Sequence, residues 1–154
     1  MRMYSVTFEN VAITALQDLI SIQPADDVPV EIHGAYITQG SDMGDAEAEG
    51  IRVEIVRGNT TTGSGGSAAT PRALDPNVGA ASSTVRINDT TEASAGTEHQ
   101  LHAEQFNNQI GFHYTPTPEM RPRSNQGAGF LTLRLLGAPA DSLSVSGTIY
   151  FAEG

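Results

Sequence analysis

Hydrophobic and polar residues alternate along much of this chain. In MYSVTFEN, residues 3–10, the apolar side chains of Tyr4, Val6 and Phe8 occupy every second position. A period of two places such side chains on one face of a β-strand. The same pattern, with short irregularities, predicts further strands over 18–23, 28–40, 51–57, 83–89, 99–106, 108–116, 129–137 and 142–153.

The alternation is irregular at a few positions. We expect Gly34 to bend or bulge the strand that contains it, because glycine inside a strand often marks a bulge. In the last strand the phase is expected to shift near Gly147. Residues 11–20, VAITALQDLI, also have helical spacing. A helix is the less favoured alternative there, since the segment is short and Ile13 and Thr14 are β-branched.

Eight to ten short alternating strands and no long helix predict an all-β protein. Strands that alternate in this way have one buried and one exposed face, which is typical of antiparallel sheets rather than buried parallel ones. We therefore expect a single domain, residues 1–154, that folds as an antiparallel β-sandwich of jelly-roll-like type. The first and last strands are expected to pair within its sheets.

Two long excursions interrupt the strands, at about 57–83 and 115–129. The first contains GNTTTGSGGSAATPRALDP and the second is TPTPEMRPRSNQGAG, and neither shows a strand pattern. Connections usually have about 4–6 residues, and much longer ones are commonly functional or disordered. We expect these long loops to contact a partner, while disordered excursions remain the alternative.

Composition restricts the classes of partner. All eight basic residues are arginines, and eighteen carboxylates give a net charge of −10. This charge disfavours binding to nucleic acid and to anionic membranes. No segment has the roughly 20 apolar residues of a membrane helix. The N-terminal residues lack the apolar core of a signal peptide, so we expect synthesis in the cytoplasm.

No motif predicts an enzyme, a cofactor or a metal site. The chain has no G-x-S-x-G motif, no cysteine and no P-loop lysine. In HQLHAE, His99 and His102 lie three residues apart, so on a strand they would face opposite sides and would not share a metal. An acidic segment lacks the calcium-loop spacing; its carboxylates are Asp42, Asp45, Glu47 and Glu49.

Several stretches together resemble small virion structural proteins of tailed bacteriophages. They are YSVTFENVAITALQDLISI with PADDVPVEIHG, EGIRVEIVRGNTTTGSGGSAATPRALDP, LHAEQFNNQIGFHYTPTPEMRP and APADSLSVSGTIYFAE. The likeness covers nearly the whole chain and lies in its pattern of strands and loops. It implies a β-rich protein on the outside of the head shell or in the tail, and it implies no catalytic residues.

This resemblance leads us to expect a non-enzymatic capsid decoration, or cement, protein that binds the outer head surface and stabilises the shell. The expected partners are the major capsid protein and copies of the chain itself, as a homotrimer. Arg72, Arg121 and Arg123 lie in the two excursions and are expected to pair with carboxylates of a partner.

The alternative function is a carbohydrate- or receptor-binding module of a phage tail or baseplate. Lectin sites on β-sandwiches often use aromatic side chains, and several are available here. They are Tyr4, Tyr36, Phe112, Tyr114, Tyr150 and Phe151, and the strand pattern assigns most of them to the core.

Overall fold

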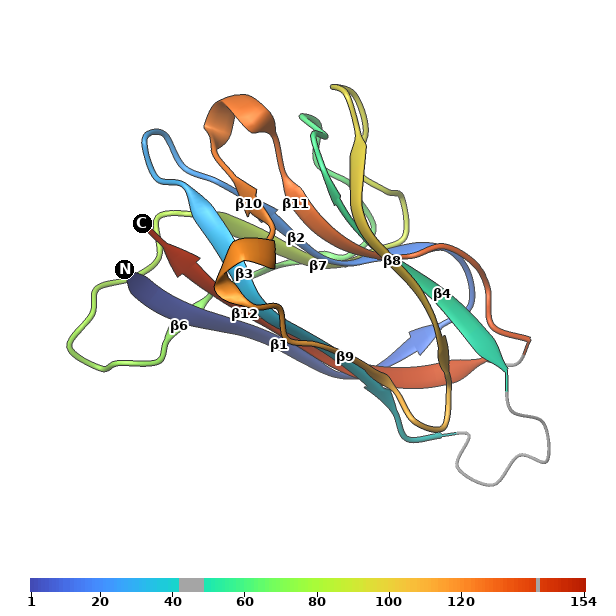
Figure 1. Ribbon diagram of the computed structural model, residues 1–154. Coiled ribbons are helices and arrows are strands. Elements are labelled where there is room, and N and C mark those ends of the chain that lie inside the picture. Colours follow the sequence, from blue (N-terminus) through green and yellow to red (C-terminus); the bar gives the residue numbers. More distant parts are fainter. Residues whose placement is uncertain (42–48, 141) are drawn as a thin grey trace.

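The computed structural model describes residues 1–41, 49–140 and 142–154 and is an antiparallel β-sandwich, as the sequence predicts (Figure 1). The strands are β1 (Arg2–Ile13), β2 (Gln17–Gln23), β3 (Val30–Gln39), β4 (Gly50–Arg57), β5 (Ser67–Ala69), β6 (Arg72–Ala73), β7 (Thr84–Asp89), β8 (His99–Asn107), β9 (Phe112–Tyr114), β10 (Arg123–Ser124), β11 (Leu131–Leu135) and β12 (Leu143–Glu153). None of the helices described is long and apolar enough to cross a membrane.

The strands form two sheets. Sheet A has the order β10-β3-β12-β1-β6, with β9 also paired to β3, and sheet B has the order β5-β7-β2-β11-β4-β8. The pairing is nested: β1 pairs with β12, β2 with β11, β3 with β9 and β10, and β4 with β8. The chain is thus folded back on itself, and its two antiparallel sheets pack against each other as a β-sandwich. Both terminal strands lie in the middle of sheet A (Figure 1).

The core lies between the sheets and follows the alternation in the sequence. Tyr4, Val6 and Phe8 of β1 are buried, and the ring of Tyr4 stacks on Phe151 of β12 at 5.6 Å between centroids. From sheet B the core receives the side chains of Leu131, Leu133, Leu135, Ile20, Ile22, Val53 and Ile55. Burial of such side chains stabilises the fold by about 1.5–3 kcal/mol each before entropy is subtracted.

The irregular positions differ in outcome. The bulge expected at Gly34 is confirmed, because the β3–β12 register shifts between Ile32 and Gly34. The shift expected at Gly147 is wrong: residues 143, 145, 147, 149 and 151 are all buried in one unbroken phase. The alternation continues through this position because Gly147 itself faces the core. A Cβ atom added there would lie 2.7 Å from the ring of Phe8. Residues 11–20 contain strands and no helix.

The first excursion has more regular structure than its sequence suggests. Within 57–83, β5 pairs with β7 and β6 pairs with β1. Residues 58–66 lie against 90–98 through two isolated bridges, Thr61 with Ser94 and Ser64 with Thr91. The strands β5 and β6 could not be predicted from the sequence, because two or three residues are too few to show an alternating pattern.

The second excursion also follows the sheet. Within 115–129, two 3-10 turns, η1 (Pro118–Met120) and η2 (Gln126–Ala128), flank β10. The backbone N–H of Ile32 donates to the carbonyl of Pro122 at 2.9 Å, and β10 pairs with the start of β3. The segment therefore covers the start of the β3 edge of sheet A, and β9 covers residues 35–37 of the same edge.

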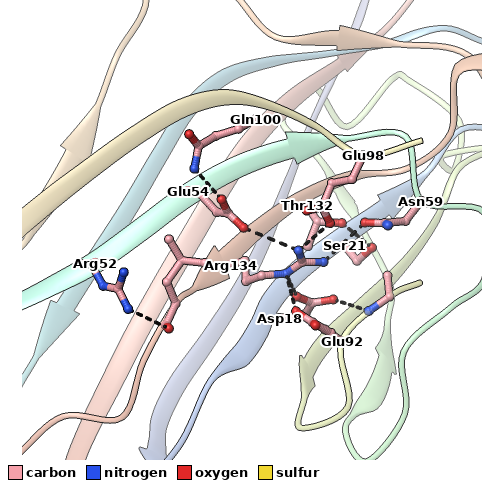
Figure 2. Close-up of polar contacts among 12 residues, drawn as sticks. Asp18, Ser21, Arg52, Glu54, Asn59, Glu92, Glu98, Gln100, Thr132 and Arg134 are labelled. Atoms are coloured by element: carbon pink, nitrogen blue, oxygen red, sulfur yellow. Dashed lines mark hydrogen bonds and ion pairs between the residues drawn. The ribbon is translucent and has the colours of Figure 1, made fainter. Parts of the chain in front are cut away.

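A buried arginine lies on the outer face of sheet B. Arg134 of β11 is 2% exposed and stands between Asp18 of β2 and Glu54 of β4 (Figure 2). Its Nε lies 2.6 Å from Asp18 Oδ1, and its guanidinium lies 3.4 Å from Glu54 Oε1. These contacts neutralise charges that would be costly to bury alone.

The same guanidinium also contacts the two segments 58–66 and 90–98, here called the covering segments. Glu98 and Glu92 approach it at 2.6 and 3.4 Å, and Asn59 Oδ1 accepts a hydrogen bond from it at 3.3 Å. Asp18 in turn accepts a hydrogen bond from the backbone N–H of Ala93 at 2.7 Å. One cation therefore joins three strands to residues from both covering segments, as Figure 2 shows.

Replacing Arg134 with Met should leave Asp18 and Glu54 buried without their cation. We expect a loss of about 3–5 kcal/mol in the free energy of unfolding, the usual cost of breaking a buried ion pair. Urea unfolding followed by circular dichroism would measure it. The matched control is Arg52→Met on β4, since Arg52 is exposed and its side chain donates a hydrogen bond only at 3.4 Å, to Leu136 O. A loss equal to that of the control would contradict the assigned role.

Candidate functional site

The densest group of ionisable side chains, around Arg134, has the contacts of a structural cluster. Asp18 accepts hydrogen bonds from Arg134 and from the backbone N–H of Ala93. Glu54 also accepts a hydrogen bond from Gln100 at 2.6 Å. Burial by itself lowers the pKa of Arg134, but hydrogen bonds with Asp18 and Glu98 outweigh it and hold that pKa above its ordinary value. A group that stays charged cannot transfer a proton.

The histidine and acidic motifs form no metal site among the residues that the structure describes. His102 pairs with Glu104 at 3.2 Å, and its ring lies 4.4 Å from the ring of Tyr114, between centroids. The ring contact links β8 of sheet B to β9 of sheet A. Of the acidic segment, only Glu49 is described, where it accepts a hydrogen bond from Ala140 N at 2.7 Å. Asp42, Asp45 and Glu47 lie outside the described residues.

The three arginines predicted to bind a partner do not form one group. Arg72 is exposed in β6, at one edge of sheet A, whereas Arg123 lies in β10 at the opposite edge. Arg121 lies two residues before Arg123, and both guanidinium groups contact Glu31, at 3.2 and 2.5 Å. The structure thus brings Arg121 and Arg123 together and separates Arg72 from them.

Beside Arg121 and Arg123 the surface contains a depression of about 350 Å³, here called the arginine pocket. One wall comes from sheet B and the other from the segment around η1. Its lining residues are Arg57, Leu101, Pro118, Glu119, Met120, Arg121, Pro122 and Arg123.

A β-bulge supplies the apolar wall from sheet B. The register between β4 and β8 shifts so that Leu101 is the extra residue, between Gln100 and His102. Bulges re-aim side chains and are frequent near functional sites. Leu101 and Met120 are both exposed to solvent, Met120 by 67%. The pocket therefore offers apolar surface that the fold itself does not cover.

Positive charge surrounds this apolar surface. Arg57, Arg121 and Arg123 outnumber Glu119 in the lining, in a chain whose net charge is −10. Arg57 donates a hydrogen bond to the carbonyl of Arg123 at 3.0 Å, and the side chain of Arg123 is 65% exposed. Guanidinium groups bind carboxylates in a planar, two-pronged geometry. The pocket can thus hold an apolar side chain and a carboxylate at once.

His33 lies next to Glu31, and the charge of the neighbouring arginines affects its pKa. Its Nε2 is 2.9 Å from Glu31 Oε1, without the alignment of a hydrogen bond. Burial, followed by the charge of Arg121, lowers the pKa of His33 below its ordinary value of 6.5, although Glu31 acts in the opposite direction. His33 is therefore neutral near pH 7.

Sequence reasoning found two members of the pocket and missed the others. Arg121 and Arg123 were recognisable as charges in an otherwise proline-rich excursion. From the sequence alone, Arg57 is the solvent-facing last residue of a strand, and Leu101 is a single apolar residue in a polar strand. Only the pairing of β4 with β8 and the bulge at Leu101 bring them beside η1.

The lowered pKa of His33 predicts how stability changes with pH. As the pH falls through the ordinary pKa of 6.5, an unfolded chain takes up a proton on this histidine before the folded protein does, so the free energy of unfolding falls with the pH. His33→Gln should flatten this part of the profile. Urea unfolding at a series of pH values would measure the slope. The control is His99→Gln, at an exposed histidine of β8. An unchanged slope in His33→Gln would rule out this histidine as the cause.

No protein-family model, no curated protein and no solved structure matches the chain.

Proposed function

We propose that the protein is a non-enzymatic structural component of a tailed-phage particle, a capsid decoration protein that binds the outer surface of the head shell and stabilises it. The observation that carries the proposal is the arginine pocket, in which cations surround uncovered apolar side chains on a rigid β-sandwich. The sequence resemblance to virion structural proteins supports the same role. The partner in this proposal is the major capsid protein.

The chemistry of the pocket fits a protein surface better than a substrate. A partner side chain would pack between Leu101 and Met120, while carboxylates next to it would bind Arg57 and Arg123. Such a contact is small, with a few strong interactions at its centre. A particle that presents many identical sites compensates for this, because several linked contacts raise the overall affinity. A homotrimer would provide three linked contacts at a local three-fold position of the shell.

The body of the protein suits this role mechanically. The chain has no cysteine, so no disulfide supports it. Strand pairing holds the two excursions instead, together with the contact of Arg134 with Asn59 in the first and the contacts of Glu31 with the arginines of the second. An ordered pocket loses less conformational entropy on binding than a mobile one, and so retains more of its interaction energy.

The location can be tested by separating the heads and tails of virions from the phage that encodes the chain. We expect the protein in the head fraction, on the order of hundreds of copies per particle, because a shell repeats its sites by symmetry. Quantitative gel analysis against the major capsid protein would measure the ratio. A few copies, confined to tails, would contradict the proposal and favour the alternative of a carbohydrate- or receptor-binding module of the tail.

The contribution of the pocket can be tested with heads that lack the protein. Arg57→Gln and Arg123→Gln should each weaken binding about tenfold, equal to about 1.4 kcal/mol, because each removes a charge-assisted hydrogen bond. Occupancy on purified heads over a range of protein concentrations would measure this. Arg52→Gln is the control, with the same change in net charge at an exposed position outside the pocket. Arg72→Gln separately tests the remaining arginine of the sequence prediction. Equal occupancy for all variants would exclude the pocket as the contact surface.

A further inference from the structure

The outer face of sheet A contains a second depression, which has a different chemistry. It measures about 180 Å³ and lies over β1, β12 and β3, which are adjacent in the sheet (Figure 1). Thr7, Thr148 and Tyr36 form one row across these strands, since Thr7 pairs with Thr148 and Thr148 pairs with Tyr36. Ser146 and Thr38, which also pair with each other, form the next row. Four aliphatic hydroxyl groups thus surround one small depression.

A β-bulge adds a carboxylate to these hydroxyl groups. The β1–β12 register shifts between Phe8 and Val11, so Glu9 and Asn10 are accommodated beside Ser146. Asn10 has a φ of 51°, in the left-handed region, and its backbone N–H donates to Ser146 Oγ at 3.2 Å. The exposed Glu9 lines the depression as a result. As at Leu101, a bulge re-aims a side chain at a surface hollow.

The aromatic side of the depression is held in place by its neighbours. The ring of Tyr36 folds over Gly34, where its atoms come within 3.0 Å of the position of a Cβ atom. Tyr150 meets this ring edge-on at 6.0 Å and His113 meets it at 5.9 Å, both measured between centroids. The Tyr36 hydroxyl forms a hydrogen bond of 2.9 Å with Thr115 Oγ1. The ring therefore forms a pre-organised wall.

We propose that this depression binds one ring of a neutral saccharide. Ligand sites combine an apolar or aromatic surface with a few well-placed polar groups. A sugar ring can place its C–H face against Tyr36, and its hydroxyl groups can donate to and accept from Thr7, Thr148 and Ser146. Glu9 can accept two further hydrogen bonds.

The charge of the site selects among saccharides. Glu9 is the only charged side chain among the described residues that line the depression, and the whole chain is acidic. Sugars that carry carboxylates, sulfates or phosphates are repelled, so the ligand is a neutral hexose or N-acetylhexosamine. The lining shares no residue with the arginine pocket. The inference is therefore independent of where the protein sits on a particle.

The test is a titration of the ¹⁵N-labelled full chain with a panel of neutral monosaccharides, followed by NMR. Glucose, galactose, mannose, N-acetylglucosamine and N-acetylgalactosamine form the panel, and glucuronic acid serves as the anionic comparison. We expect saturable shifts for at least one neutral sugar, confined to residues around Thr7, Thr38, Ser146 and Thr148, with dissociation constants on the order of 1 mM. Glucuronic acid should bind at least about tenfold more weakly than the neutral sugar.

Two variants locate the site. Thr148→Val removes a hydroxyl group without changing the shape of the side chain, and Glu9→Gln removes the charge. Each should weaken binding about tenfold. Thr84→Val is the matched control at an exposed threonine of β7 in sheet B, and it should bind as the unmodified chain does. Thermal unfolding confirms that each variant is folded.

Three results would overturn the inference. They are the absence of saturable shifts with every neutral sugar, shifts that map to another surface, and unchanged affinity in both Thr148→Val and Glu9→Gln. None of these results bears on binding to heads, which is measured with other variants and another partner.

Discussion

The paths of segments 58–66 and 90–98 depend on the ion pairs and hydrogen bonds of the Arg134 guanidinium group. It is almost fully buried, and carboxylates from β2, β4 and the segment 90–98 lie within 3.4 Å of it. In a setting of low dielectric, neither this cation nor Asp18 is tolerated without the other. Because Glu92, Glu98 and Asn59 belong to the covering segments, satisfying the buried charge also fixes their paths. A glycine- and threonine-rich stretch that would otherwise have little to bury is thereby ordered.

A second carboxylate has a similar effect at the edge of sheet A. Glu31 binds Arg121 and Arg123 and lies beside His33, so the proline-rich segment between β9 and β10 is tied to β3. The arginines are held in position by this pairing, and they still present donors to solvent, Arg123 most of all. An internal ion pair and an external binding role are therefore compatible, since a guanidinium group has five N–H donors.

Two surface hollows, one cationic and apolar, the other uncharged except for Glu9 and rich in hydroxyl groups, lie on different parts of the same body. Each receives a side chain from a β-bulge, Leu101 in the first case and Glu9 in the second. A bulge changes where one side chain points while the core alternation of the strand continues on both sides of it. The sandwich can thus carry two binding surfaces without loss of core packing, and the proposed attachment to a shell and the inferred binding of a sugar need not compete.

The sequence by itself determined the sandwich, most strand positions and the bulge at Gly34, because a period of two is a local property that burial of one face imposes on each strand. It also marked Arg121 and Arg123 as unusual charges. It did not determine the short strands β5, β6 and β10, the partners of Arg134, or the meeting of Arg57 and Leu101 with η1. Those depend on which strands pair and in which register, and residues such as Asp18 and Arg134, 116 positions apart, become neighbours only when the sheets close. Tertiary structure alone decided them, since the energy of a buried charge depends on what surrounds it and not on its place in the chain.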